Sequence, residues 1–116
     1  MLILALFFFL LLKGEHLTAE DSKALYINIE GSLNESNAKE FIARLKESKG
    51  ELVIRINSSS GSLSSALNLA KEIYTERRKK GTKVIVYIDS TSVGPSAILP
   101  FLADELYISL FATWGD

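Results

Sequence analysis

The chain has 116 residues, with 13 basic and 14 acidic side chains, one histidine and no cysteine. This length leaves room for about one small domain, and the balanced charge provides no basic stripe of the kind that follows a nucleic-acid backbone. The lack of cysteine excludes disulfides, zinc–thiolate sites and thiol catalysis. The single histidine, His16, stands beside an N-terminal apolar run, so a Ser-His-Asp triad within this chain would have to use it. We therefore expect no nucleic-acid partner, no metal and no cofactor.

Residues 1–12 form an unbroken apolar run that ends at Lys13 and is followed by a polar stretch up to Lys23. The run is shorter than the roughly 20 residues of a membrane-spanning helix, but it fits the apolar part of a signal peptide, which needs about 7 to 15. No Lys or Arg precedes it, and its cleavage-like site, residues 17–19, begins with a large leucine. We expect residues 1–23 to be a signal peptide or membrane anchor with a polar linker. The protein would then be membrane-associated or exported, on the periplasmic or extracytoplasmic face of the inner membrane. The alternative is that the run is a buried strand or core helix of the domain.

The first elements after this segment are a strand, a helix and a second strand. Residues 24–30 alternate apolar and polar side chains, which predicts a half-buried strand ending before Gly31. Asn34 is placed to cap a helix that ends before Gly50. The apolar positions with helical spacing in it are Ala38, Phe41, Ile42 and Leu45. Residues 52–56 are a short β-branched run, suited to a sheet that is covered on both faces.

The second half repeats this alternation. The expected elements are a loop at 57–62, an amphipathic helix at 63–80, a buried strand at 83–88, a loop at 89–96, an apolar helix at 97–103 and a strand at 106–108. Gly81 ends the long helix, and Pro100 bends or shortens the apolar one. This order predicts an α/β fold with a mostly parallel sheet and right-handed crossover helices.

The two predicted loops, 57–62 and 89–96, each leave a strand and open a helix. In parallel sheets ligands bind beyond the carboxyl ends of the strands, so we expect these loops side by side on one rim. Their backbone N–H groups would point toward whatever lies between them, and the Ser/Gly-rich loop 57–62 would suit half of an oxyanion site. The simpler alternative is helix capping by Ser60 or Ser62.

The stretch INSSSGSLSSALNLAKEIYTERRKKGTKVIVYI, the segments SVGPSAILPFLADELYI and TWGD, and ALYINIEGSL resemble signal peptide peptidase A. Signal peptide peptidase A, also called protease IV, belongs to peptidase family S49 of the Clp-protease/crotonase-like superfamily. The NfeD-type membrane serine proteases are nearly as similar to the present sequence. The resemblance covers residues 24–116. It implies a mostly parallel sheet with crossover helices, a peptide or signal-peptide substrate and a homo-oligomer. Because the family continues past the position of TWGD, we expect 24–116 to be a partial domain that is incomplete at the C-terminus.

In that family the first loop reads Asn-Ser-Pro-Gly-Gly-Ser, and its Gly-Gly amides help to bind the oxyanion. Here Ser59 stands for the proline, Ser60 for the first glycine and Gly61 for the second. The resemblance therefore implies that Ser60, Gly61 and Pro95 belong to the oxyanion and substrate-binding site.

The second loop departs from the family pattern, because the position of the nucleophilic serine is occupied by Gly94. Ser92 and Ser96 lie two residues away, and we take Ser96 as the candidate displaced nucleophile. A shift of two residues at a helix start turns the side chain by about 200°. The family's general base is a lysine, but no lysine follows Lys83, and the neighbouring lysines fit a solvated helix end.

Three functions remain open from the sequence. The first is an S49-like serine peptidase that acts on membrane-proximal peptides through Ser96. The second is a degenerate, non-catalytic homologue that binds peptide or mediates assembly. The third is a crotonase-type acyl-CoA enzyme, although the sequence contains no identifiable adenine pocket. Residue chemistry favours the second, because neither the family's nucleophile nor its base is found.

Overall fold

The computed structural model describes residues 24–115. The predicted signal segment, residues 1–23, including His16, and the last residue, Asp116, lie outside the described residues. The predictions for that segment therefore stay predictions. Within residues 24–115, no helix combines the length and the apolar character that crossing a membrane requires.

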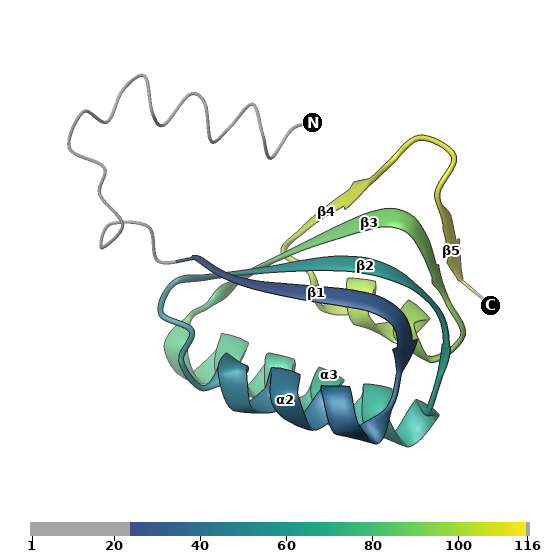
Figure 1. Ribbon diagram of the computed structural model, residues 1–116. Coiled ribbons are helices and arrows are strands. Elements are labelled where there is room, and N and C mark those ends of the chain that lie inside the picture. The colour runs from purple at the N-terminus through teal and green to yellow at the C-terminus, as the bar shows by residue number, and fades with distance from the viewer. Residues whose placement is uncertain (1–23, 116) are drawn as a thin grey trace.

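The strands form one parallel sheet (Figure 1). Its strands are β1 (Ala24–Leu33), β2 (Glu51–Gly61), β3 (Lys83–Val93), β4 (Glu105–Ile108) and β5 (Thr113–Gly115). The first four lie in the order β1-β2-β3-β4, and β5 pairs with β3 further along its length than β4 does. Every pairing is parallel. The predicted α/β fold with a mostly parallel sheet is therefore confirmed.

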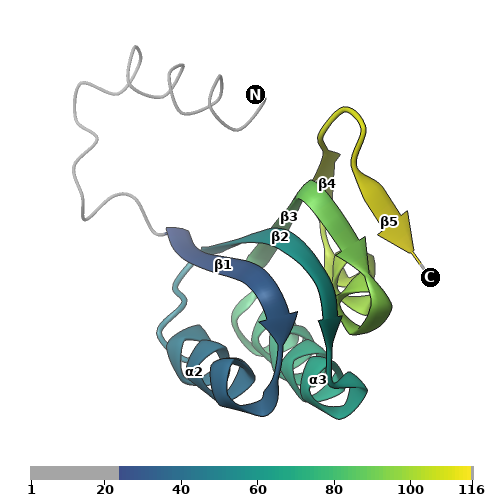
Figure 2. The same ribbon diagram turned by 45° about the vertical axis from the view of Figure 1, so that its right-hand side comes forward.

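The helices α2 (Glu35–Leu45) and α3 (Leu63–Lys80) and the 3-10 helix η1 (Gly94–Leu102) lie on the same face of the sheet (Figures 1 and 2). They cover one set of alternate strand residues, which forms the core with the apolar faces of the helices. Its fully buried strand members include Ile27, Ile29, Leu52, Ile54, Ile56, Val84, Val86 and Ile88. Among the described residues the opposite face carries no helix, although Val53 and Ile85 on it are buried as well. The prediction of a sheet covered on both faces is therefore confirmed for one face and stays a prediction for the other. We call this second face, on which Arg55 of LVIRI keeps its charge near water, the open face.

The strands are longer than predicted, because β2 continues to Gly61 and β3 to Val93. Most of both predicted loops is therefore extended strand. Ser58 pairs with Ser92 across β2 and β3, and Ser60 pairs with Ser32 of β1. Serine has little intrinsic preference for strands, but pairing with neighbouring strands outweighs local propensity.

The predicted start of α2 at Asn34 and the predicted end of α3 at Gly81 are confirmed, whereas α2 ends at Leu45 and not directly before Gly50. The side chain of Asn34 accepts the backbone N–H of Asn37 at 3.0 Å, and the side chain of Asn37 accepts the backbone N–H of Asn34 at 2.9 Å. This reciprocal capping satisfies two N–H groups that a helix start leaves free. At the end of α3, Gly81 adopts the left-handed conformation with φ of 67°. The apolar segment around Pro100 is a 3-10 helix, and it begins at Gly94 rather than at Ala97.

The outer edge of β1 is the first edge of the described sheet. Two side chains of α2 reach strand carbonyls there. Arg44 donates from its guanidinium to the carbonyl of Tyr26 at 2.5 Å, and the Asn37 amide donates to the carbonyl of Ser32 at 2.7 Å. The helix thus supplies hydrogen-bond donors to a strand that has no neighbour on this side among residues 24–115.

Candidate functional site

The ends of β2 and β3 meet the starts of α3 and η1 at one rim of the sheet (Figure 1). A single residue, Ser62, separates β2 from α3, and η1 follows β3 directly. Ser58 and Ser92 are register partners, and the Ser96 hydroxyl donates to the Ser58 carbonyl at 3.2 Å. The prediction that the segments around 57–62 and 92–96 lie side by side is therefore confirmed.

Three buried serines connect these segments. Ser58, Ser92 and Ser96 are at most 1% exposed. The Ser92 hydroxyl donates to the carbonyl of Ser96 at 3.1 Å, and the Ser58 hydroxyl donates to the carbonyl of Ser60 at 3.3 Å. The Ser96 hydroxyl also lies 3.2 Å from the carbonyl of Val93. Backbone carbonyls thus satisfy all three hydroxyls, as buried polar groups require.

Ser96 is therefore held as a structural link in this conformation. A serine hydroxyl has one proton to donate, and the partners within reach of the Ser96 proton among the described residues are carbonyl oxygens and the Ser92 hydroxyl. A nucleophilic serine needs a base as partner and access to substrate. The catalytic role of Ser96 stays a prediction.

Gly94, at the position of the family's nucleophile, marks the turn from β3 into η1. Its φ is 65°, in the left-handed region that side chains of L-residues rarely adopt. A β-carbon there would lie 3.5 Å from the carbonyl oxygen of Ser59, which is an ordinary contact. The position therefore faces the first predicted loop and has space for a small side chain, at the expense of backbone strain. Pro95 follows at the second position of η1, within the first turn, where its missing N–H removes no helical hydrogen bond.

Ser60 and Gly61 lie further along β2 and pair with β1. At Gly61 φ is 143°, and a β-carbon would overlap the carbonyl oxygen of Leu33 and lie 2.8 Å from its nitrogen. Ser62 caps α3: its hydroxyl accepts the N–H of Ser65 at 3.2 Å. Its own N–H donates to the Leu33 carbonyl at 2.9 Å. Of the two capping candidates, Ser62 is the one that the structure confirms.

The structure thus divides the predicted site residues into two groups. Ser96 bonds to Ser58 of β2 and a β-carbon added at Gly94 would face Ser59, whereas Ser60 and Gly61 pair with β1. The sequence analysis missed the aromatic side of this rim. Trp114 pairs with Ser92 in the sheet, and its indole N–H donates to the carbonyl of Ala97 in η1 at 3.0 Å. Its ring lies 5.2 Å from that of the exposed Phe101.

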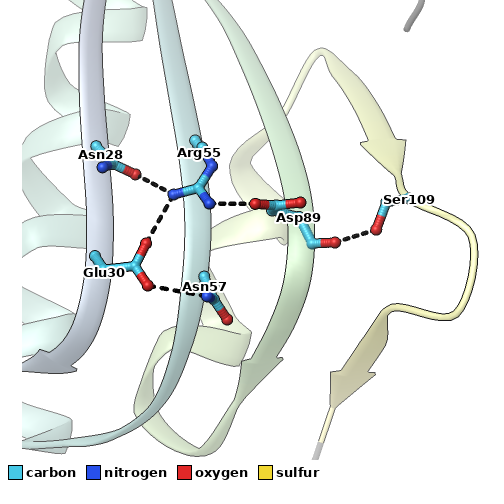
Figure 3. A network of polar contacts seen from close by, with 6 residues as sticks. All are labelled: Asn28, Glu30, Arg55, Asn57, Asp89 and Ser109. Atoms are coloured by element: carbon cyan, nitrogen blue, oxygen red, sulfur yellow. Dashed lines mark hydrogen bonds and ion pairs between the residues drawn. The ribbon is translucent and has the colours of Figure 1, made fainter.

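A polar network spans the open face of the sheet close to the same rim (Figure 3). Arg55 at its centre donates to the side chains of Asn28 at 2.6 Å and Glu30 at 2.8 Å, and forms an ion pair with Asp89. Asn57 donates to the other oxygen of Glu30 at 3.0 Å. The network joins β1, β2 and β3, and the hydroxyl of Ser109 extends it by donating to the backbone carbonyl of Asp89.

This network holds strands together and offers no unpaired acid or base. The hydrogen bond to Glu30, followed by Asp89, raises the pKa of the Arg55 guanidinium above its ordinary value, so the charge is permanent. Both carboxylates are engaged with Arg55. Within residues 24–115, no group of acidic or histidine side chains is arranged to hold a metal ion. The sequence signal for this network was the alternating polar positions in the first three strands. The network was not predicted, because the sheet was expected to be covered on both faces.

Comparison with solved structures shows that the described chain has a Clp-protease-like fold. A mutant of ClpP1 from Listeria monocytogenes is similar to it with a TM-score of 0.54 and 18% sequence identity. The match covers 67% of this chain and 46% of that chain, so the present sequence corresponds to somewhat less than half of the matched protein. At this identity the likeness concerns the fold alone. No protein-family model and no curated protein matches the sequence.

Proposed function

We propose that this protein is a non-catalytic homologue of the S49 signal peptide peptidases, which binds membrane-proximal peptide segments and assembles with copies of itself. The observation that carries the proposal is the glycine at position 94. In the family that the sequence resembles, this position is that of the nucleophilic serine, and a glycine has no side chain that attacks a carbonyl. The membrane location rests on residues 1–12 and is part of the proposal.

The nearest alternative nucleophile argues for the same conclusion. Ser96 is fully buried and its hydroxyl is directed at the carbonyls of Ser58 and Val93. To act on a peptide, it would have to leave both partners and become exposed. Among the described residues, no nitrogen base is hydrogen-bonded to it.

A lysine base is equally hard to place. Catalysis by a Ser/Lys pair needs a neutral lysine near the hydroxyl. Lys83 is the last lysine of the sequence and stands at the start of β3, about 30 Å of extended chain away from Ser92. It forms an ion pair with Glu105, and their hydrogen bond raises the pKa of the Lys83 ammonium. Lys83 is therefore held in the charged state, which is the wrong one for a base.

Peptide binding is supported by what the rim presents. Ser60 and Gly61 are exposed at the end of β2, and on the β3 side of the sheet Phe101 and Trp114 supply exposed aromatic surface. Exposed aromatic side chains at the end of a sheet suit an extended peptide, because pockets for its side chains give specificity in such recognition.

The proposal is tested with the full chain, a fluorophosphonate probe and a fluorogenic peptide. We expect neither labelling nor turnover. Gly94→Ser should remain inactive, because its hydroxyl would still need a base within about 2.6 to 3.2 Å. Labelling that is lost in Ser96→Ala and kept in Ser64→Ala, an exposed control, would overturn the non-catalytic assignment. Binding is measured separately, by the anisotropy of a fluorescent signal peptide, and no binding would refute the peptide-binding part.

A further inference from the structure

The solvent face of α3 has an unusual charge composition. Its exposed residues are Leu63, Ser64, Leu67, Asn68, Lys71, Tyr74, Thr75, Arg78, Lys79 and Lys80. This set contains four cations and no carboxylate. Of the two acidic residues of the helix, Glu72 is partly buried, and Glu76 is buried beside Lys80, with 2.6 Å between the ammonium and a carboxylate oxygen. The exposed positions of the helix therefore carry only positive charge.

Three large apolar side chains form a line along this face. Leu63, Leu67 and Tyr74 are separated by four and seven residues, so they lie above one another on the helix. They are 57%, 47% and 48% exposed, although the core already takes the other face of α3 through Ala66, Leu69 and Ile73. The fold therefore does not require this second apolar line.

Cations stand directly beside the line. Lys71 follows Leu67 by one helical turn, and Arg78 follows Tyr74 in the same way. The guanidinium carbon of Arg78 lies 5.7 Å from the centre of the Tyr74 ring, and a guanidinium nitrogen lies 3.2 Å from the phenol oxygen. Each cation thus has an apolar partner on its N-terminal side. We call Leu63, Leu67, Lys71, Tyr74 and Arg78 the outer face of α3.

We propose that the outer face of α3 binds the surface of an anionic lipid bilayer. Lysine and arginine beside apolar side chains are the composition of helices that lie in the headgroup region, where the apolar side chains enter the acyl boundary and the cations meet lipid phosphates. A tyrosine suits this depth, because its ring is apolar and its hydroxyl stays in the polar layer. Packing the same face against a second copy would bring Lys71 and Arg78 against like charges, so a bilayer fits better than self-association through α3.

This contact would be weak by itself and would orient the protein. Stable membrane attachment generally takes two signals, such as an inserted apolar group and a basic surface. If residues 1–12 supply the first, as the sequence predicts, α3 supplies the second and turns its outer face, on the helical side of the sheet in Figure 2, toward the bilayer. The open face of the sheet, with its Arg55 network, would then point away from the lipid.

Vesicle co-sedimentation of the full chain measures the charge contribution. Vesicles of phosphatidylcholine alone are compared with vesicles that also contain phosphatidylserine. The substitutions Lys71→Gln and Arg78→Gln each remove one positive charge, and each should weaken binding to the anionic vesicles about fivefold. The matched controls are Lys39→Gln and Lys46→Gln, which remove the same charge from exposed positions on and just after α2. These should weaken binding clearly less.

A second measurement locates the contact even if residues 1–12 bind vesicles on their own. The chain has no cysteine, so Leu67→Cys and the control Glu40→Cys each provide a single site for an environment-sensitive fluorophore. We expect a blue shift at position 67 with anionic vesicles and none at position 40. The proposal is overturned if position 67 shows no shift, or if the α3 substitutions weaken binding no more than the α2 controls do.

Discussion

At Gly61 the end of β2 passes so close to β1 that a side chain has no room. We predict that Gly61→Ala destabilises the protein by about 3 kcal/mol or more, because the β-carbon would overlap the backbone of Leu33 and the φ of 143° is itself unfavourable for alanine. Gly31→Ala is the matched control, since Gly31 also has a positive φ but no atom within 4 Å of an added β-carbon. It should cost about 1 to 2 kcal/mol. Urea unfolding of both variants gives the comparison, and equal losses would contradict the steric argument.

At Ser96 the hydroxyl links η1 to β2. We predict that Ser96→Ala lowers the free energy of unfolding by about 1 kcal/mol, because the carbonyls of Ser58 and Val93 lose a buried donor. Ser64→Ala, at an exposed position of α3, should change it by less than about 0.5 kcal/mol. A Ser96→Ala protein as stable as the unmodified chain would show that this hydrogen bond contributes nothing.

The sequence predicted which residues gather at the rim, but not their roles in the structure. Gly94, Ser96, Ser60 and Gly61 are brought near the ends of the same two strands, because parallel strands place their carboxyl ends together. Their burial and hydrogen bonds could not be predicted, since these depend on how far β2 and β3 continue. From the sequence alone a serine-rich stretch is interpreted as a loop, because its pairing with adjacent strands is not known.

At the scale of elements, β4 is tied to β3 by an ion pair whose strength depends on pH. The ammonium of Lys83, followed by the hydroxyl of Tyr107, lowers the pKa of the Glu105 carboxyl below its ordinary value of 4.5. Glu105 therefore contributes stability above the pKa of the unfolded chain, and this contribution is lost as the pH falls through the lower pKa of the folded state. Urea unfolding below about pH 4.5 should show the loss.

Substitution of the cation separates this pair from other carboxylates. In Lys83→Met the fall in stability between neutral and acidic pH should be smaller than in the unmodified chain, because the pKa of Glu105 loses its main cause of depression. Lys79→Met removes a charge from the exposed end of α3 and should leave the pH dependence unchanged. The same slope in Lys83→Met as in the unmodified chain would contradict the assignment.

The helix caps at Asn34 and Gly81 were predictable, whereas the strand ends were not. Asn34 and Gly81 act through local hydrogen bonds and local backbone conformation, so the sequence around each is sufficient. β2 and β3 end where their partners end, which is information from elsewhere in the chain. The same distinction explains η1, whose start is set by the turn at Gly94 rather than by the apolar residues that follow.

At the scale of the whole molecule, the parallel order of the strands followed from the alternation of strands and helices, but the placement of the helices did not. Apolar runs such as those of β2 and β3 are compatible with one or two covered faces. The charged and polar residues at alternate positions distinguish one covered face from two. Arg55, Glu30 and Asp89 lie together on the open face, as Figure 3 shows.

In the part of the chain that the structure describes, no strand pairs with the outer edge of β1, and this has a consequence for solubility. An unpaired strand edge is a template on which another chain can add a strand and begin an aggregate. The guanidinium of Arg44 occupies the Tyr26 carbonyl on this edge, so an incoming strand would have to displace a charged donor. We predict that Arg44→Ala leaves the fold intact but increases turbidity and binding of an amyloid dye during prolonged incubation. Arg78→Ala, which removes the same charge elsewhere, should not. A clear solution of Arg44→Ala under the same conditions would show that the edge is protected by other means.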